Sequence, residues 1–226
     1  MIDRVRAVIF DVDGTLLHSN DAHAEAFALA MGEHGFSVDQ SVVRRLIGKG
    51  SDKLLPEAIG VTADSPLGAT IVSRKKELFH TRLLPRLGPT PGARALVEEL
   101  VRRGLDLAVA SSAGADELGV LLAQAGVGDL LERRVAADDV GESKPEPDVF
   151  VAALAELDAE EHRDRVVVVG DTPYDVESAR RAGLQIVALR CGGWRDENLH
   201  GAAAIFDDPA HLLRDLDRSP LVQTSR

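Results

Sequence analysis

The alternation of apolar and polar positions separates short apolar runs from longer amphipathic segments. Short, β-branched apolar runs are typical of strands buried in a parallel sheet. Such runs predict strands at residues 5–10, 105–110, 135–137, 165–169, 185–189 and 204–206. Apolar residues at helical spacing predict helices at residues 93–103, 115–125, 147–157, 174–182 and 210–216. Strands that alternate with helices in this way predict an α/β fold, with a Rossmann-like parallel sheet and helices on both faces.

The stretch between the first strand and residue 88 has only helical periodicity. Apolar residues recur at helical spacing over residues 22–30, and Gly35 is expected to end this helix. Further helices are predicted at residues 46–60 and 70–84. We therefore predict two domains: an α/β core formed by residues 1–17 and 88–226, and an inserted all-α cap formed by residues 18–87.

Composition narrows the class of protein. The chain has 226 residues, of which 45% are apolar and 28% charged, values that are ordinary for a soluble globular protein. Apolar runs such as residues 166–169 are far too short to span a bilayer, and the N-terminus carries no apolar signal region. Cys191 is the only cysteine, which excludes an internal disulfide. We predict a cytoplasmic protein without a membrane partner.

The charge balance limits the partners further. The net charge is −11, and the densest basic run, residues 74–76, is expected to be a solvated helix face. We therefore predict no nucleic-acid partner. An acidic protein repels phosphorylated ligands at long range, so a phosphate site would need local positive charge. The oligomeric state cannot be read from the sequence.

Polar residues follow several predicted strands, and an open parallel sheet binds its ligands beyond the carboxyl ends of its strands. These residues are Asp11, Asp13, Ser111, Ser112, Lys144, Asp171 and Asp175. Although they are dispersed in sequence, we expect them to converge in space.

The aspartates suggest a cation. Asp11 and Asp13 are two positions apart on an extended chain, so their side chains point the same way and repel unless a cation lies between them. Asp171 follows a buried strand, where an unpaired carboxylate is costly. Mg²⁺ prefers such oxygen ligands. The alternatives are turn aspartates after the first strand and an N-cap aspartate after the later one.

The serines and the lysine suggest an anion site. Ser111 and Ser112 precede a predicted helix, whose free N–H groups bind anions, although an ordinary N-cap is the simpler interpretation. Pro145 restricts Lys144 to extended geometry, and its ammonium could neutralise a phosphate. The alternative is a surface-loop lysine.

Taken together, these residues resemble a known family. Residues 11–15 (Asp-Val-Asp-Gly-Thr), Ser111, Lys144 and residues 170–175 (Gly-Asp-Thr-Pro-Tyr-Asp) are similar, in order and spacing, to the four motifs of the haloacid dehalogenase-like superfamily. The helical insertion resembles that of its phosphoglycolate phosphatase and β-phosphoglucomutase branch. The resemblance implies a Mg²⁺-dependent phosphatase acting on a small phosphorylated metabolite, such as phosphoglycolate or a sugar phosphate.

The resemblance also implies roles for the core residues. Asp11 would attack phosphorus and form an aspartyl phosphate, while Asp13 would act as general acid and base. Mg²⁺ would be bound by Asp11, the backbone carbonyl of Asp13, and Asp171. Asp175 would orient Lys144 or a metal-bound water. The residues implied to hold the phosphate are Ser111, Ser112 and Lys144.

In the predicted cap, residues 48–53 form a glycine-rich, basic turn that resembles the substrate loop of this branch. Lys49 would then contact the substrate, although a plain helix-to-helix turn explains the pattern equally well. His23 matches a position where relatives often carry histidine and could contact substrate or the acid/base. A helix-surface histidine is the alternative.

Other functions share these core residues. A sugar phosphate mutase would need a second phosphate-binding site in the cap, for which Lys49 and Lys53 are candidates. A dehalogenase needs no metal, which disfavours it because Asp13 and Asp171 are both present. An inactive phosphate-binding protein is a further alternative, and the intact set of motifs argues against it.

Overall fold

The computed structural model describes residues 5–222, which form two compact units. The first unit comprises the described residues up to His18 together with those from Gly88 onward, and the second comprises Ser19–Leu87. The chain passes between them after His18, one residue beyond the boundary expected from the sequence. The ends of the predicted core, residues 1–4 and 223–226, lie outside the described residues.

The first unit contains a six-stranded sheet in which every pairing is parallel, in the order β3-β2-β1-β4-β5-β6. Its strands are β1 (Ala7–Phe10), β2 (Asp106–Ala110), β3 (Arg133–Val135), β4 (Val166–Gly170), β5 (Gln185–Leu189) and β6 (Ala204–Phe206). The predicted α/β fold with a Rossmann-like parallel sheet is confirmed. The short strand was expected at residues 135–137 but lies at Arg133–Val135, so its predicted position was wrong by two residues. Residues from Ala137 form a 3₁₀ turn instead.

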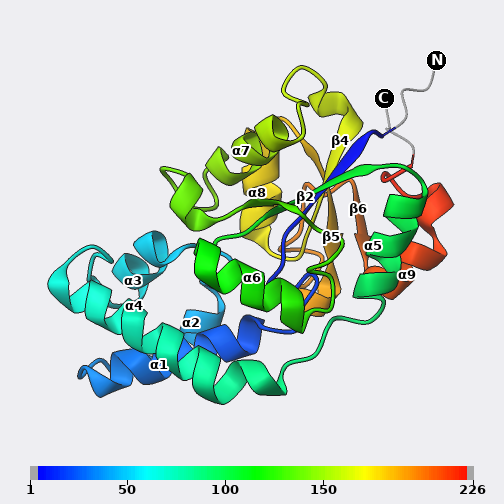
Figure 1. Cartoon of the computed structure of the whole chain (residues 1–226). Helices are drawn as coiled ribbons and strands as arrows, with labels where there is room; N and C mark the ends of the chain where they lie inside the picture. Colours follow the sequence, from blue (N-terminus) through cyan, green and yellow to red (C-terminus); the bar gives the residue numbers. More distant parts are fainter. Residues whose placement is uncertain (1–4, 223–226) are drawn as a thin grey trace. The chain divides into compact units, whose positions relative to one another are not determined.

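Helices cover the sheet, as Figure 1 shows. Helices α7 (Asp148–Glu156) and α8 (Pro173–Arg181) pack on one face, where alternate strand residues join a single apolar core with Phe150 and Leu154. Helices α5 (Ala93–Arg102) and α9 (Pro209–Arg214) pack against each other on the other side. Helix α6 (Ala115–Gln124) connects β2 to β3. Because β4 is buried on both faces, its run of valines needs no polar positions.

The strand register places the ends of three strands at one edge of the sheet. Phe10, the last residue of β1, lies beside Val109 of β2 and Val169 of β4. Residues that follow these strands therefore begin at the same level of the sheet. The two segments next to the second unit also run together, since the His18 N–H donates to the Gly88 carbonyl at 3.1 Å.

The second unit is helical. Its helices are α1 (Asn20–Glu33), α2 (Gln40–Arg44), α3 (Ser51–Ile59) and α4 (Pro66–Leu78), followed by a π-helical turn over Phe79–Leu83. The helix predicted over residues 46–60 was wrong in its first turn. Gly48 has a φ of 111° and Gly50 is the extended N-cap of α3, so helical backbone begins only at Ser51.

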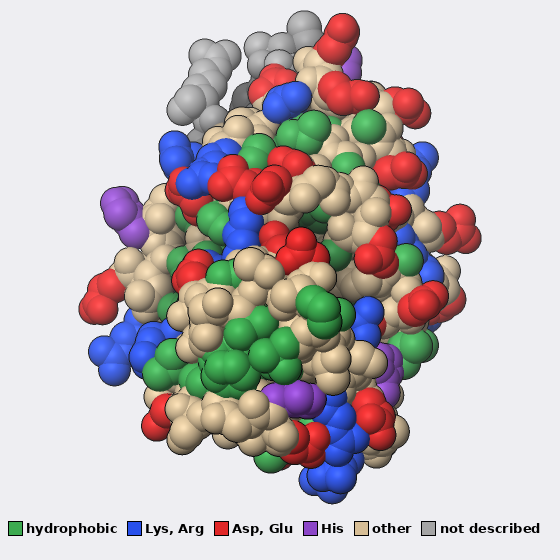
Figure 2. Space-filling view, turned by 90° about the vertical axis from the view of Figure 1, so that its left-hand side faces the viewer, with side chains coloured by type: hydrophobic (Ala, Val, Ile, Leu, Met, Phe, Trp, Pro, Cys, Tyr) green, Lys and Arg blue, Asp and Glu red, His purple; other side chains and the backbone are tan. Residues whose placement is uncertain are grey.

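Helix length and surface charge bear on the partners expected from the composition. Within residues 5–222, no helix combines the length and the apolar character needed to cross a membrane. On the face seen in Figure 2, basic and acidic side chains are interspersed. The absence of a nucleic-acid partner stays a prediction.

Candidate active site

Asp11 is the first residue after β1, and the sheet itself positions it. Its backbone N–H donates to the carbonyl of Val169 at 2.9 Å, which continues the pairing of β1 with β4. The side chain is buried, with 6% of the residue exposed. A carboxylate is thus held at the sheet edge with little access to water.

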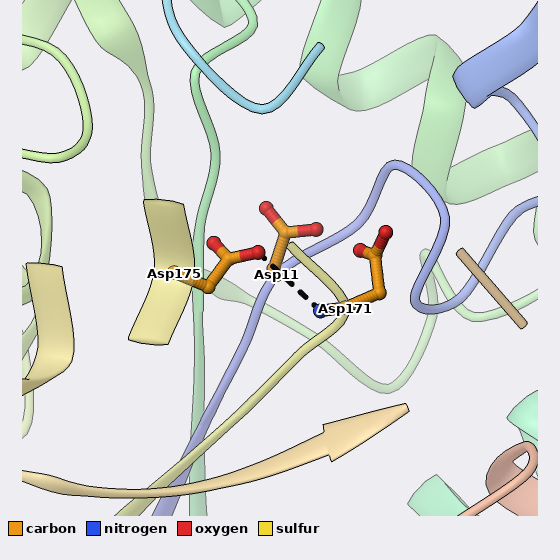
Figure 3. Close-up of side chains that lie close together, drawn as sticks. All are labelled: Asp11, Asp171 and Asp175. Atoms are coloured by element: carbon orange, nitrogen blue, oxygen red, sulfur yellow. Dashed lines mark hydrogen bonds between the residues drawn. The ribbon is translucent and has the colours of Figure 1, made fainter. Parts of the chain in front are cut away.

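Two more buried carboxylates come from the end of β4 and the start of α8. Asp11, Asp171 and Asp175 each offer a ligand atom, and these atoms all lie within 4.8 Å of one another. Figure 3 shows the three carboxylates turned toward the same region. Oδ2 of Asp175 accepts hydrogen bonds from the Asp171 N–H at 3.3 Å, the Thr172 N–H at 2.9 Å and the Thr172 hydroxyl at 2.7 Å. These bonds fix the Asp175 carboxylate at the first turn of α8.

Lys144 joins two of these carboxylates. Its ammonium Nζ lies 2.6 Å from Oδ1 of Asp11 and 2.8 Å from Oδ1 of Asp175, and it also donates to the Ala110 carbonyl at 3.1 Å. Nζ lies 5.1 Å from the centre of the Phe150 ring. Because only 1% of Lys144 is exposed, the surface-loop alternative was wrong.

Burial and charge shift the ionisation of this cluster. Burial raises the pKa of Asp11 from 3.8 to about 7; Lys144 opposes the rise, while Asp175 and Asp13 add to it. Burial alone would lower the pKa of Lys144, but the carboxylates of Asp11 and Asp175 hold it above its ordinary value. The lysine therefore stays charged.

The same cluster fits a hard divalent cation. Three buried carboxylates face one ammonium group, which leaves an excess of negative charge away from water. A buried charge of this kind is costly unless it is paired. The available donors are carboxylate oxygens, which Mg²⁺ prefers. In the described part of the chain, the carboxylate of Asp13 is not a member of this group. The carbonyl contribution expected of Asp13 stays a prediction.

Thr15 is a site residue for which sequence reasoning predicted no role. Its hydroxyl donates to Oδ1 of Asp171 at 2.8 Å, and the residue is completely buried. Its carbonyl accepts from the Thr90 hydroxyl at 2.7 Å. The available signal was its place at the end of residues 11–15, but its partner lies 156 positions away.

Ser111 and Ser112 follow β2 as expected, but they are not helix caps. Helix α6 begins at Ala115 and its N-cap is Gly114, whose backbone is extended, so the N-cap alternative was wrong. The Ser111 hydroxyl accepts from the Ala113 N–H at 3.0 Å, and Ser111 is buried. The phosphate-binding role of both serines stays a prediction.

The remaining predicted residues belong to the second unit. His23 is buried in α1 and stacks on Phe79, with ring centroids 4.0 Å apart and planes 9° apart, so a helix-surface histidine was wrong. The Lys49 ammonium forms an ion pair with Glu57 of α3. Lys49 does lie in a turn between α2 and α3, and its contact with substrate stays a prediction.

Comparisons with known proteins place these features in context. Residues 8–189 match the haloacid dehalogenase-like hydrolase family. A phosphoglycolate phosphatase from Rhodospirillum rubrum is 33% identical over 216 residues, covering 92% of this chain and 89% of that protein. An N-acetylmuramic acid 6-phosphate phosphatase from Pseudomonas aeruginosa is 30% identical over 224 residues, covering 96% of each chain. The crystal structure of a hydrolase from Pseudomonas syringae has a TM-score of 0.87 at 28% identity, covering 94% of this chain and 98% of that one.

Proposed function

We propose that this chain, which belongs to the haloacid dehalogenase-like hydrolase family, is a Mg²⁺-dependent phosphatase that hydrolyses a small organic phosphate monoester. Its relatives support this, because both are named as phosphatases of small phosphorylated compounds. The observation that carries the proposal is the ion pairing of buried Lys144 with Asp11 and Asp175 beside Asp171. A cytoplasmic location stays a prediction.

Mg²⁺ would be held by Asp11, Asp171 and the backbone carbonyl of Asp13. Asp175 would act mainly through Lys144, since its Oδ1 is 2.8 Å from the ammonium and its Oδ2 is bound by three donors. When bound, Mg²⁺ supplies positive charge that stabilises the transferring phosphoryl group. The charge excess of the buried carboxylates supports this assignment.

In the first half-reaction, a carboxylate oxygen of Asp11 attacks phosphorus. The bond from phosphorus to the ester oxygen breaks, and Asp13 gives its proton to the departing alkoxide. An aspartyl phosphate remains on Asp11. Lys144 is charged and already within hydrogen-bonding distance of Asp11, so it can pair with phosphate oxygens there, together with Ser111. It thereby offsets the repulsion between nucleophile and phosphate.

In the second half-reaction, the deprotonated Asp13 takes a proton from water as the water oxygen attacks phosphorus. The bond between phosphorus and the Asp11 oxygen breaks, which releases inorganic phosphate and restores the carboxylate. Partial exposure of Asp13, in contrast to the buried Asp11, is consistent with contact with leaving groups and water.

A sugar phosphate mutase is the alternative function that would use the same core residues. A mutase must hold a second phosphate, for which Lys49 and Lys53 were the candidates, and the Lys49 ammonium is paired with Glu57. The proposed substrate is a single-phosphate metabolite, such as phosphoglycolate or a sugar phosphate, because the two relatives are named as phosphatases.

The test is a phosphate-release screen over a panel of metabolite phosphates, with and without Mg²⁺. We expect release from at least one member in Mg²⁺ and none in excess chelator, with the Asp11→Asn variant as the matched control. Product analysis by phosphorus NMR separates hydrolysis from transfer within a sugar phosphate. An absence of release across the panel, with Mg²⁺ bound, would contradict the proposal and favour an inactive phosphate-binding protein.

A further inference from the structure

The turn that follows β5 lies directly against Asp171. Arg190–Gly192 forms a short 3₁₀ turn, and Gly192 is buried. A Cβ atom built on Gly192 would lie 1.8 Å from Oδ2, 2.4 Å from Cγ and 2.5 Å from Cβ of Asp171. These distances are all far inside van der Waals contact. The turn and the carboxylate therefore coexist only because residue 192 has no side chain.

Rotation of the Asp171 side chain cannot relieve this collision. Its Cβ position is set by the backbone, and that atom alone would be 2.5 Å from the added methyl group. Backbone conformation does not explain the glycine either, because Gly192 does not have the positive φ seen at Gly193, which is 87°. Space for Asp171 is the remaining physical reason for a glycine.

The turn is anchored on its other side, so it cannot simply move away. The Arg190 guanidinium donates to both carboxylate oxygens of Asp196, at 2.6 and 2.9 Å, and to Asp207 at 2.7 Å. A planar guanidinium paired in this bidentate way holds a defined geometry. The Cys191 thiol donates to the Gly14 carbonyl at 3.2 Å, and burial raises the pKa of that thiol. One turn thus contacts both Asp171 and the segment that carries Asp13.

We propose that Gly192 is a positioning residue for Asp171. The hydroxyl of Thr15 binds Oδ1 of Asp171 at 2.8 Å, and the backbone at Gly192 closes the space next to Oδ2. The carboxylate is confined between these two groups and keeps the orientation in which it lies beside Asp11 and Asp175. This inference rests on the proposed function in one respect, namely that Asp171 binds Mg²⁺.

The test compares the Gly192→Ala and Gly119→Ala variants of the full chain. Gly119 lies in α6, and beyond its chain neighbours and its own helix backbone no atom lies within 4 Å of a built Cβ, so its substitution is the matched control. Mg²⁺ binding is measured directly by titration calorimetry, independently of turnover. Displacing a group that orients a metal ligand typically weakens affinity by roughly 10–100-fold. We expect a loss of that size in Gly192→Ala and unchanged affinity in Gly119→Ala.

The outcomes separate the two proposals. If the wild-type chain binds no Mg²⁺, the metal assignment of the proposed function fails. If the wild type binds Mg²⁺ and Gly192→Ala binds it equally well, the positioning role is overturned.

A second comparison covers the case in which Gly192→Ala does not fold. The three atoms nearest to the built Cβ all belong to the Asp171 side chain, so Asp171→Gly removes these three contacts. We expect the loss of thermal stability caused by Gly192→Ala to shrink in the Asp171→Gly background, or folding to be restored there. An equal loss in both backgrounds, or a double variant that still does not fold, would overturn the inference.

Discussion

The Lys144 ammonium lies 2.6 Å from Oδ1 of Asp11, although 133 positions separate the two residues along the chain. Both side chains are buried, so neither charge is stabilised by bulk water. Loss of Lys144 would leave buried carboxylates without their counter-charge, whereas loss of the Asp11 charge leaves Lys144 paired with Asp175. The ion pair therefore affects both the stability of the fold and the proposed reaction. The same contact helps to keep Lys144 charged and holds the carboxylate of Asp11, the proposed nucleophile, in place.

We expect Asp11→Asn to abolish turnover without unfolding the protein. A neutral amide is a poor nucleophile for phosphorus and a poor ligand for Mg²⁺. Steady-state kinetics at saturating metal, with circular dichroism as the folding control, measures both. Retention of a tenth or more of the wild-type kcat would contradict the covalent mechanism.

The same variant is expected to change the pH dependence of stability in chelator. The pKa of Asp11 in the folded chain, about 7, is above its ordinary value of 3.8, so the folded state binds this proton more tightly than the unfolded state. The wild type then loses stability as pH rises from about 4 to about 7, and Asp11→Asn lacks this component. The free energy of unfolding, measured with urea from pH 4 to 8, should fall less with pH in Asp11→Asn than in the wild type. If the two proteins show the same pH dependence, the raised pKa of Asp11 is contradicted.

Asp13→Asn should slow the reaction by about 10²–10⁴-fold, the usual contribution of general acid–base catalysis. The loss should be largest with an alkyl phosphate, whose leaving group needs a proton, and smaller for the first step with an aryl phosphate. Parallel kinetics on the two substrates measure this difference. Unchanged rates with the alkyl phosphate would show that the proton comes from another group.

Activity should require Mg²⁺, and Ca²⁺ should inhibit. Ca²⁺ takes more ligands at longer distances, which would misplace the Asp11 carboxylate relative to phosphorus. Mg²⁺ should also raise the melting temperature, because it binds the folded site and relieves repulsion among the buried carboxylates. Activity assays and thermal melts in chelator, Mg²⁺ and Ca²⁺ provide the measurement, and full activity in excess chelator would contradict the metal requirement.

Thr15→Val should weaken Mg²⁺ binding and destabilise the fold by about 1–3 kcal/mol, since it leaves Oδ1 of Asp171 without its hydroxyl donor. Thr70→Val is the matched control, because that exposed hydroxyl only donates to the Pro66 carbonyl within α4. Chemical unfolding and Mg²⁺ titration of the two variants make the comparison. Equal effects at both positions would contradict a role for Thr15 in orienting Asp171.

Substitution of Lys49 or Lys53 by Ala should change substrate preference more than it changes activity on a small aryl phosphate. The core residues act on the phosphoryl group of every substrate alike, so selectivity must come from groups that touch the rest of the molecule. The measurement is kcat/KM on the best metabolite from the screen and on the aryl phosphate.

The Glu57→Gln variant complements the lysine substitutions, because it removes the negative charge that pairs with Lys49 while leaving the lysine in place. If Lys49 binds substrate, this variant should strengthen binding of the metabolite. An equal fall on both substrates in the lysine variants would show that residues 48–53 support the fold rather than select the substrate.

The sequence by itself determined the parallel sheet and the residues at its edge. Buried strands such as β4 must be apolar throughout, and that requirement is local enough to read from Val166 to Val169. Polar residues directly after such strands are confined to one edge by the parallel topology. Asp11 and Asp171 could be found in this way, since each directly follows a strand. Lys144 follows a strand only after a loop, and Asp175 lies in the first turn of α8, but the structure brings all four residues together.

Only the tertiary structure decided which of these residues touch, and which neighbours hold them. Serines before a predicted helix are typical N-caps, so the sequence favoured Ser111 and Ser112 as caps. In the structure α6 begins only after Gly114, whose extended backbone is not evident from the sequence. Thr15 donates a hydrogen bond to Asp171 from 156 positions away in the chain. The backbone of Gly192 approaches Asp171 closely from 21 positions away (192 − 171). Such contacts leave no periodic pattern in the sequence, because they depend on where the backbone of one segment passes the side chain of another.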